Sequence, residues 1–222
     1  KYEGNVTSRS IDDRWVADVL SSESRPVEGF TDVLLVQDVF SRFLWATPMG
    51  SKKETTRAFK THLETTGRAC RELSTDKGAE FTSAEFQGLM AEEGIYHRFK
   101  VALNDLSVID RAMGVLKDRI AVIAAEAGDS WLDALQTAVN AHNSLDARSL
   151  LDNAPEDVAH DDELRFRLRQ ENAAKSQENV ELAIDRKEKL EAEGGFRTLL
   201  QKEGVKRRAG LPNWSSDVRQ VA

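Results

Sequence analysis

Residues 33–49 of the chain read VLLVQDVFSRFLWATPM. The first four residues are continuously apolar, which is typical of a strand covered on both faces of a sheet. Ser41 and Arg42 mark a short connection, and the residues that follow read as a second strand. Consecutive strands joined this closely pair most simply as antiparallel neighbours. The stretch therefore predicts two antiparallel strands near the centre of a fold.

The residues before this stretch add a third strand. RWVADVLSS, residues 14–22, has the composition of a strand, and Glu28 with Gly29 suits a hairpin turn before the next strand-like run, FTDVLLVQDV. We expect three consecutive antiparallel strands between residues 13 and 48.

Strands and helices alternate after this meander. Ser51 to Glu54 and Thr82 to Glu85 fit the capping-box pattern, in which side chains satisfy the free amides of a first helical turn. They predict helices over 52–65 and 83–93. The short segments 71–75 and 95–99 are each long enough for one strand. This order predicts an α/β fold with a mixed sheet flanked by helices.

Residues 106–127 read as one long helix. One face of this helix is apolar, with Ile109, Met113, Leu116, Ile120 and Ile123 at helical spacing. Asp110, Gly114 and Lys117 share a second face, about 100° around. A further helix is expected from Trp131, and Pro155 fits the first turn of another element.

The composition changes near residue 160. Residues 162–193 are rich in charge and contain no proline, and Gly194 and Gly195 follow them. We expect a long arm or spacer helix with a patchy apolar stripe that needs a partner. The expected organisation is an N-terminal linker over 1–12, a core domain over 13–160, an extended helix over 161–195 and the start of a truncated module over 196–222.

Bulk composition limits the possible functions. The chain has 222 residues, a formal net charge of -7 and one cysteine, Cys70, so it cannot form a disulfide framework or a cysteine-based zinc site by itself. The charge argues against coating nucleic acid by bulk attraction, although it allows a local carboxylate cluster that touches DNA. No segment has the apolar core of a signal peptide or the ~20 apolar residues of a membrane span. We expect a soluble protein of a reducing, intracellular compartment.

Three acidic residues occur where the expected topology would gather them. Asp18 lies inside the apolar run WVADVL, where an unpaired charge would cost several kcal/mol unless a metal or a partner neutralises it. Asp76 follows a strand and precedes Gly78, so its carboxylate can project from the strand end. Asp110 lies near the start of the long helix. The alternative for Asp76 to Gly78 is an ordinary turn.

The ordered set of motifs resembles the catalytic core of retroviral and LTR-retrotransposon integrases, of the ribonuclease H-like superfamily, nearest to the gypsy-type elements. The similar segments are RWVADV, VLLVQDVFSRFLWATPM, STDKGAEFTSAEFQGLMAEEGIYHRF, NDLSVIDRAMGVLKDRI and WLDALQTAVNAHNSLDARSLLDNAPEDV. The resemblance covers about residues 9–160. It implies a ribonuclease H-like mixed five-stranded sheet, followed here by a long C-terminal helix.

The resemblance also implies roles for individual residues. Asp18, Asp76 and Asp110 correspond to the family's three catalytic metal ligands, and Lys117 to its DNA-contacting lysine. The family normally has Glu at the third position, and Asp110 is one methylene shorter. Arg111 and Lys77 are further DNA-binding candidates, which act on phosphates.

The implied chemistry is metal-dependent DNA 3′-end processing and strand transfer. Two Mg²⁺ ions about 3.5–4 Å apart, with Mn²⁺ as a substitute, activate the attacking oxygen and stabilise the leaving oxygen. Mg²⁺ prefers oxygen ligands and is usually held by one or two carboxylates. Asp18 would bridge both ions, Asp76 would complete one site and Asp110 the other.

Two other functions stay open. A domesticated or degenerate core would bind DNA or protein without catalysis, for which the shortened Asp110 is the motivating observation. A related ribonuclease H-like nuclease would cut DNA without joining it. The expected partners are DNA, as element ends and target, and further copies of the chain in at least a dimer, with no membrane. The expected place of action is the nucleus.

Several other residues have ordinary structural interpretations. We expect Asp38 to be structural, Glu80 to make a surface contact, Glu85 to cap a helix and His97 to be a hydrogen-bonded core histidine. The histidines His62, His97, His142 and His160 are scattered, so the family's N-terminal zinc module is not predicted here. Lys206, Arg207 and Arg208 suit a DNA contact, a nuclear signal or a solvated linker equally. LPNWSSDVRQVA resembles the first strand of the family's C-terminal barrel.

Overall fold

The computed structural model describes residues 5–21, 26–100, 106–192, 196–199 and 214–219. The chain divides into two units, Lys1–Lys175 and Ser176–Ala222. Gly194, Gly195 and the basic run Lys206 to Arg208 lie outside the described residues, as do residues 101–105 before the long helix.

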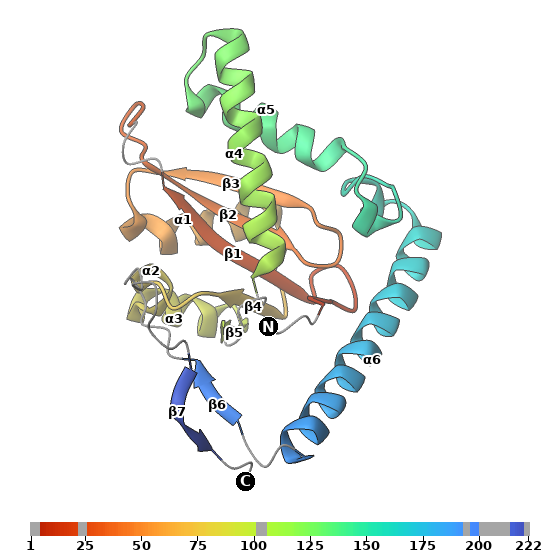
Figure 1. Cartoon of the computed structure of the whole chain (residues 1–222). Helices are drawn as coiled ribbons and strands as arrows, with labels where there is room; N and C mark the ends of the chain where they lie inside the picture. Colours follow the sequence, from red (N-terminus) through yellow and green to blue (C-terminus); the bar gives the residue numbers. More distant parts are fainter. Residues whose placement is uncertain (1–4, 22–25, 101–105, 193–195, 200–213, 220–222) are drawn as a thin grey trace. The chain divides into compact units, whose positions relative to one another are not determined.

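A five-stranded mixed sheet is the centre of the first unit (Figure 1). Its strands are β1 (Arg14–Ser21), β2 (Asp32–Asp38), β3 (Leu44–Met49), β4 (Glu72–Thr75) and β5 (Tyr96–Phe99), in the order β3-β2-β1-β4-β5. The pairs β1–β2 and β2–β3 are antiparallel, whereas β1–β4 and β4–β5 are parallel. The predicted meander and the predicted mixed sheet are both confirmed.

Helices follow the strands in the predicted order, together with a short additional α-helix and several 3-10 turns. The elements are η1 (Lys52–Glu54), α1 (Thr55–Thr66), α2 (Ala79–Thr82), α3 (Ala84–Glu92), α4 (Ser107–Ala127), α5 (Trp131–Ser144), η2 (Arg148–Leu150), η3 (Asp157–Ala159) and α6 (Asp162–Ala192). The long helix before α5 and the long C-terminal helix are confirmed. The turn α2 was not predicted.

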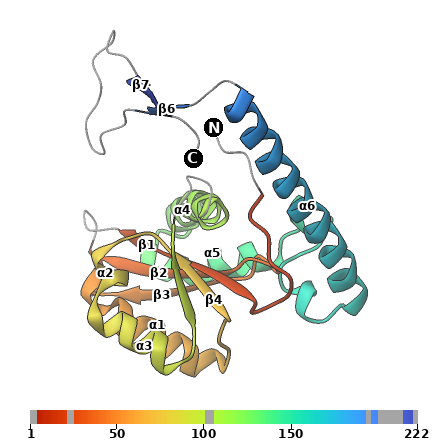
Figure 2. The same cartoon turned by 90° about the horizontal axis from the view of Figure 1, so that it is seen from below.

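The alternation of side chains along β1 divides the core into two layers. Trp15 and Ala17 point to one face and pack with α1 and α3, for example with Phe59 and Phe86. Val16 and Leu20 point to the other face and pack with α4 and α5. Because successive side chains of a strand point to opposite faces, the same strand contributes alternate residues to both layers. Figure 2 shows α4 on one side of the sheet and α1 with α3 on the other.

Both predicted capping boxes are wrong. Ser51 makes no side-chain cap hydrogen bond, because the chain first forms the 3-10 turn η1. The cap of α3 is Ser83, whose Oγ accepts from the Phe86 amide at 3.2 Å, since Thr82 is still part of α2. A capping box is present at α5, where Ser130 and Asp133 bond reciprocally.

The turn and the outer edge of the β2–β3 hairpin are fixed by side chains. Arg42 adopts a left-handed backbone with φ 62 in this turn. On β3, which is the edge strand, the Leu44 amide donates to Asn143 Oδ1 at 2.9 Å. Asn143 Nδ2 donates in turn to the Leu44 carbonyl at 2.9 Å. Helix α5 is therefore joined to the sheet by one side-chain amide.

The start of α6 belongs to the first unit. Leu164 and Leu168 are buried in a third cluster with Phe40 and Val158, and Asn172 Nδ2 donates to the Ser8 carbonyl at 3.1 Å. Packing thus continues beyond residue 160, where the composition changes. In the second unit, β6 (Phe196–Leu199) and β7 (Trp214–Arg219) form an antiparallel pair.

Candidate active site

Two of the predicted carboxylates come from neighbouring parallel strands. Asp18 is in β1 and Asp76 directly follows β4. The parallel register pairs Trp15 with Leu73 and Val16 with Ser74. Asp18 and Asp76 each follow the pair Val16 and Ser74 by two residues, so both carboxylates lie toward the same end of these neighbouring strands. Asp18 has the same parity as Val16, so it lies on the face of the sheet that α4 covers.

A chain of hydrogen bonds fixes the backbone at Asp76. Gln87 Nε2 lies 2.7 Å from the Phe81 carbonyl, to which it donates, and 2.8 Å from His97 Nδ1. His97 Nε2 lies 2.9 Å from Thr75 Oγ1, and this hydroxyl donates to the Asp76 carbonyl at 2.8 Å. Because Gln87 donates to Nδ1, neutral His97 carries its proton on Nε2. Burial lowers the pKa of His97 to about 4, which favours this neutral form.

His97 is therefore a hydrogen-bonded, partly buried histidine, and its structural interpretation is confirmed.

Gly78 leaves room for two acidic side chains. A Cβ built at this position would lie 2.7 Å from Glu80 Oε2 and 3.0 Å from Asp76 Oδ1. The two carboxylates therefore lie close together over the same glycine. The expectation that Glu80 makes a surface contact did not include its closeness to Asp76. The spacing Asp-x-Gly-x-Glu was the available signal, because a short helix after the glycine turns its first residues back toward the strand end.

Asp110 completes an acidic cluster around Asp18. Burial raises the pKa of Asp18 to about 6 against the opposing hydrogen bond from the Val19 amide. Three further carboxylates add to this shift by charge repulsion, namely Asp76, Asp110 and Glu80. Asp110 is exposed in the first turn of α4, and the neighbouring apolar face of this helix packs on β1 and β2 through Ile109 and Leu116. The fold thus brings all three predicted acids, with Glu80, into electrostatic contact.

The donor set fits a hard divalent cation in chemistry, although the side chains do not converge on one point. Within the described ranges, no group of three His, Cys, Asp or Glu side chains is close enough to hold a metal. Two of the acids turn to backbone amides: Asp18 Oδ1 accepts from Val19 at 2.7 Å, and Asp76 Oδ1 accepts from Gly78 at 2.8 Å. Clustered carboxylates repel one another, and oxygen ligands of this kind suit Mg²⁺.

The basic candidates lie in different places. Lys77 is exposed in the turn after β4. Lys117 is exposed on α4 and lines a cavity of about 680 Å³ together with Leu20 and Trp131. Arg111 lines a different cavity, on the side of α4 that faces the end of α5. The helix therefore separates Lys117 from Arg111, as expected from their positions around its axis.

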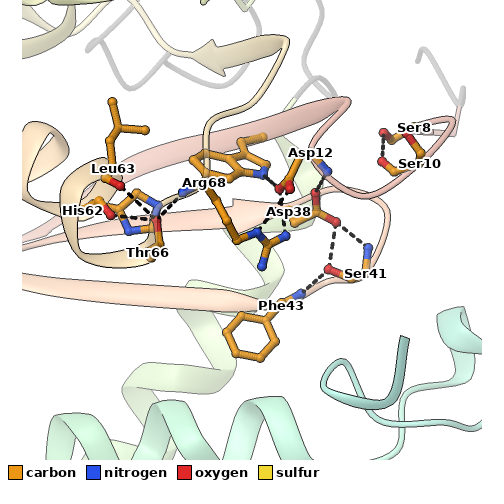
Figure 3. A network of polar contacts seen from close by, with 11 residues as sticks. Ser8, Ser10, Asp12, Asp38, Ser41, Phe43, His62, Leu63, Thr66 and Arg68 are labelled. Carbon is orange, nitrogen blue, oxygen red and sulfur yellow. Dashed lines mark hydrogen bonds and ion pairs between the residues drawn. The ribbon is translucent and has the colours of Figure 1, made fainter. Parts of the chain in front are cut away.

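Asp38 is a structural residue, as expected. Its Oδ2 accepts from the Asp12 amide at 2.9 Å, and its Oδ1 accepts from the Ser41 amide and hydroxyl at 2.6 and 2.7 Å. The network continues to Arg68, which donates to both oxygens of Asp12 (Figure 3). Asp38 thus closes the β2–β3 turn.

The comparisons with known proteins agree with this architecture. Residues 10–104 match the integrase core domain family. The HTLV-2 integrase catalytic core domain, solved in complex with magnesium in a trimeric form, is 18% identical with a TM-score of 0.56 over 67% of this chain and 97% of that chain.

A chain of the simian T-cell lymphotropic virus intasome, in complex with PP2A regulatory subunit B56 gamma, is 18% identical with a TM-score of 0.62. The match covers 71% of this chain and 58% of that chain. No curated protein matches at a significant level. The nearer likeness to gypsy-type elements stays a prediction. Residues 10–104 thus resemble the integrase core domain family in sequence, and the sheet with its helices has the fold of the retroviral integrase catalytic cores.

Proposed function

We propose that the chain is the catalytic core of a retroelement integrase, which trims the 3′ ends of element DNA and joins them to target DNA. One observation carries the proposal. Asp18 on β1 and Asp76 directly after the parallel strand β4 interact electrostatically with each other and with Asp110 of α4, the helix that covers this face of the sheet. Paired carboxylates at this position are the ligands that a phosphodiester-cleaving metal site needs.

Asp18, Asp76 and Asp110 would hold Mg²⁺, with Mn²⁺ as a substitute. When bound, the ions supply charge that activates the attacking oxygen and stabilises the leaving oxygen of the displaced phosphodiester. Glu80 is close enough to Asp76 to add a fourth oxygen donor or to orient that carboxylate. The hydrogen bonds from Gln87 through His97 and Thr75 hold Asp76 in position.

The cations next to the acids would bind the DNA. Lys117 lies about two helical turns beyond Asp110 on an exposed face of α4, where its ammonium group can meet a phosphate near the reacting end. Lys77 directly follows Asp76 and is exposed, so it can contact the same strand of DNA. Arg111 faces another cavity, which makes its contribution to this surface indirect.

The test is rejoining of a branched, labelled DNA with Mg²⁺ or Mn²⁺. The branched substrate already holds the 3′-hydroxyl beside the target phosphate. We expect the wild-type chain and Asp118→Asn, a matched control at an exposed position of α4, to join the strands. Asp76→Asn and Asp110→Asn should each reduce joining by more than a hundredfold, since each would lose a metal ligand.

The alternatives predict different products. Metal-dependent cutting without joining would favour a related nuclease. Equal inactivity of the folded wild-type and Asp76→Asn chains would favour a domesticated core that binds DNA or protein. The shorter third ligand, Asp110, and its exposed position are the observations that favour this second candidate. An Asp110→Glu variant that gains activity would assign the defect to the missing methylene.

The proposed partners are DNA and further copies of the chain. The solved HTLV-2 core exists in dimeric and trimeric forms, which supports a homo-oligomer of at least two chains. Sedimentation at micromolar concentration tests it, and a monomer would contradict it. Within the described part of the chain, no helix has the length and apolarity that a membrane span requires. Insertion into chromosomal DNA would place the protein in the nucleus.

A further inference from the structure

A cavity of about 210 Å³ lies beside the β2–β3 turn, between the start of α4 and the end of α5. Three arginines line it from two elements: Arg42 from the turn, and Arg111 and Arg119 from α4. Gln37 and His142 add polar atoms to its wall. Asp146, an exposed residue, is the one acid that lines it among the described residues.

Two of these arginines each have a buried nitrogen without a hydrogen-bond partner in the described part of the chain. Arg42 Nη1 and Arg119 Nη1 are buried, and neither has a hydrogen-bond partner within the described residues. Asp38 attracts Arg42, but its two oxygens already accept hydrogen bonds from Asp12 and Ser41. Burial lowers the pKa of Arg42 to about 10; Asp38 opposes the shift and Arg111 adds to it. A buried, unpaired guanidinium costs several kcal/mol, which is a reason to look for its counter-ion.

The fold holds Arg42 firmly at this place. Its amide donates to the Asp38 carbonyl at 2.9 Å, and its carbonyl accepts from Gln37 Nε2 at 2.8 Å. His142 Nε2 lies 3.3 Å from the same carbonyl. The left-handed backbone at Arg42 is thus fixed from β2 and from α5. Arg42 is therefore anchored beside Arg111 and Arg119 in the lining of the same cavity.

We propose that this cavity binds a phosphate group, neutralised by Arg42, Arg111 and Arg119. Guanidinium groups offer a fork of N–H donors that matches phosphate oxygens, and the buried Nη1 atoms supply unused donors. Three cations suit a dianion better than a single carboxylate. The phosphate comes either from a free phosphoryl compound or from a nucleic-acid backbone. The site uses none of the proposed metal ligands, so it stands independently of the proposed function.

The experiment titrates inorganic phosphate into the full chain without divalent metal, by calorimetry and thermal unfolding, against chloride at equal ionic strength. We expect phosphate to bind with a Kd in the millimolar range or tighter and to raise the Tm. Arg119→Gln should weaken binding at least tenfold. Arg169→Gln, at an exposed position of α6, should bind like the wild type.

Arg42→Met provides an independent check. This variant removes a buried cation, so it should have a higher Tm than the wild type without phosphate and no phosphate response. If Arg42→Met fails to fold, the phosphate response of Arg119→Gln alone tests the proposal. An equal phosphate response in wild type, Arg119→Gln and Arg169→Gln would overturn the proposal. Loss of the response in Asp76→Asn would also overturn it, because that residue lies outside the cavity.

A labelled DNA duplex distinguishes the two sources of phosphate. If phosphate releases the duplex from the wild type at the concentrations that saturate the cavity, but not from Arg119→Gln, the site takes a backbone phosphodiester. If the duplex and phosphate bind without competition, the site takes a free phosphoryl compound. Either result supports the same cavity.

Discussion

Asp18 carries a charge that the folded sheet does not favour. The carboxylate is half-buried between apolar neighbours, and three acids nearby oppose its ionisation. Its pKa in the folded chain is about 6, against an ordinary value of 3.8. The protonated carboxyl therefore stabilises the fold below pH 3.8, and this contribution is lost as the pH rises to about 6. Above pH 6 the ionised side chain costs stability, unless a bound cation offsets it.

Asp18→Asn should therefore stabilise the metal-free protein above pH 6. The amide has no charge to desolvate, so we expect the free energy of unfolding at pH 7.5 to rise by on the order of 1–3 kcal/mol, with little gain at pH 4. Urea unfolding at the two pH values measures this difference. Added Mg²⁺ should narrow it by stabilising only the wild type. A variant less stable than the wild type at pH 7.5 would contradict the interpretation.

Gly78→Ala tests the space above the glycine. Its φ of -59 is accessible to alanine, so the backbone is not strained, but the new methyl group would press on the carboxylates of Asp76 and Glu80. We expect a change in stability below about 1 kcal/mol and a loss of DNA joining of tenfold or more. Gly88→Ala is the matched control, because a Cβ there meets no atom within 4 Å. Equal activity of both variants would show that the carboxylates move aside freely.

Three elements act together on the end of β4. Helix α3 supplies Gln87, β5 supplies His97 and β4 supplies Thr75, whose hydroxyl donates to the Asp76 carbonyl. Each polar atom of this series has a partner, so the network specifies one conformation for the loop that carries Asp76. The position of a proposed metal ligand thus depends on an element that does not contact it.

Gln87→Met should break the hydrogen-bond network that positions Asp76 without creating a cavity in the core. Methionine fills a similar volume but cannot donate to His97 Nδ1 or to the Phe81 carbonyl. We expect a loss of stability of about 1–2 kcal/mol and a several-fold rise in the Mg²⁺ concentration needed for half-maximal joining. Gln136→Met, on the exposed face of α5, should change neither quantity. An unchanged Mg²⁺ requirement in Gln87→Met would show that the hydrogen-bond network does not affect the proposed metal site.

The whole chain should lose stability in mild acid. Burial lowers the pKa of His62 to about 4, Arg68 adds to the shift and Asp12 opposes it. The unfolded chain binds this proton near pH 6.5, so the contribution of neutral His62 is present above pH 6.5 and is lost as the pH falls toward 4. The shift at His97 has the same direction, whereas that at Asp18 opposes it.

His62→Phe should flatten this pH dependence. Because His62 Nε2 is buried without a partner among the described residues, phenylalanine removes an unsatisfied group and keeps the ring packed beside Trp15 and Trp45. Between pH 7.5 and 5 the wild type should lose about 2 kcal/mol more than the variant. Urea unfolding at both values measures this, and parallel pH profiles would contradict it.

Local pattern predicted most of the fold, and tertiary contacts determined the rest. The apolar run at Val33 favours a buried strand, and the helical spacing from Ile109 favours an amphipathic helix. These local patterns predicted the strands and helices correctly. The helix caps were not predicted correctly, because neighbouring Ser and Thr residues compete for each start and only packing selects Ser83. Asp18 and Asp76 were recognisable from their strands. The approach of Glu80 and the cavity at Arg42 depend on residues far apart in sequence.

Asn143 has a consequence for how copies of the chain meet. A free edge strand offers its amides and carbonyls to any other extended chain, which is how many proteins aggregate. On β3, the side chain of Asn143 occupies both backbone groups of Leu44, and Pro48 further along has no amide hydrogen to offer. An added strand from a neighbour would therefore find few backbone partners along β3. Ordered contacts between copies of the chain on this side of the sheet are left to the side chains and to α5.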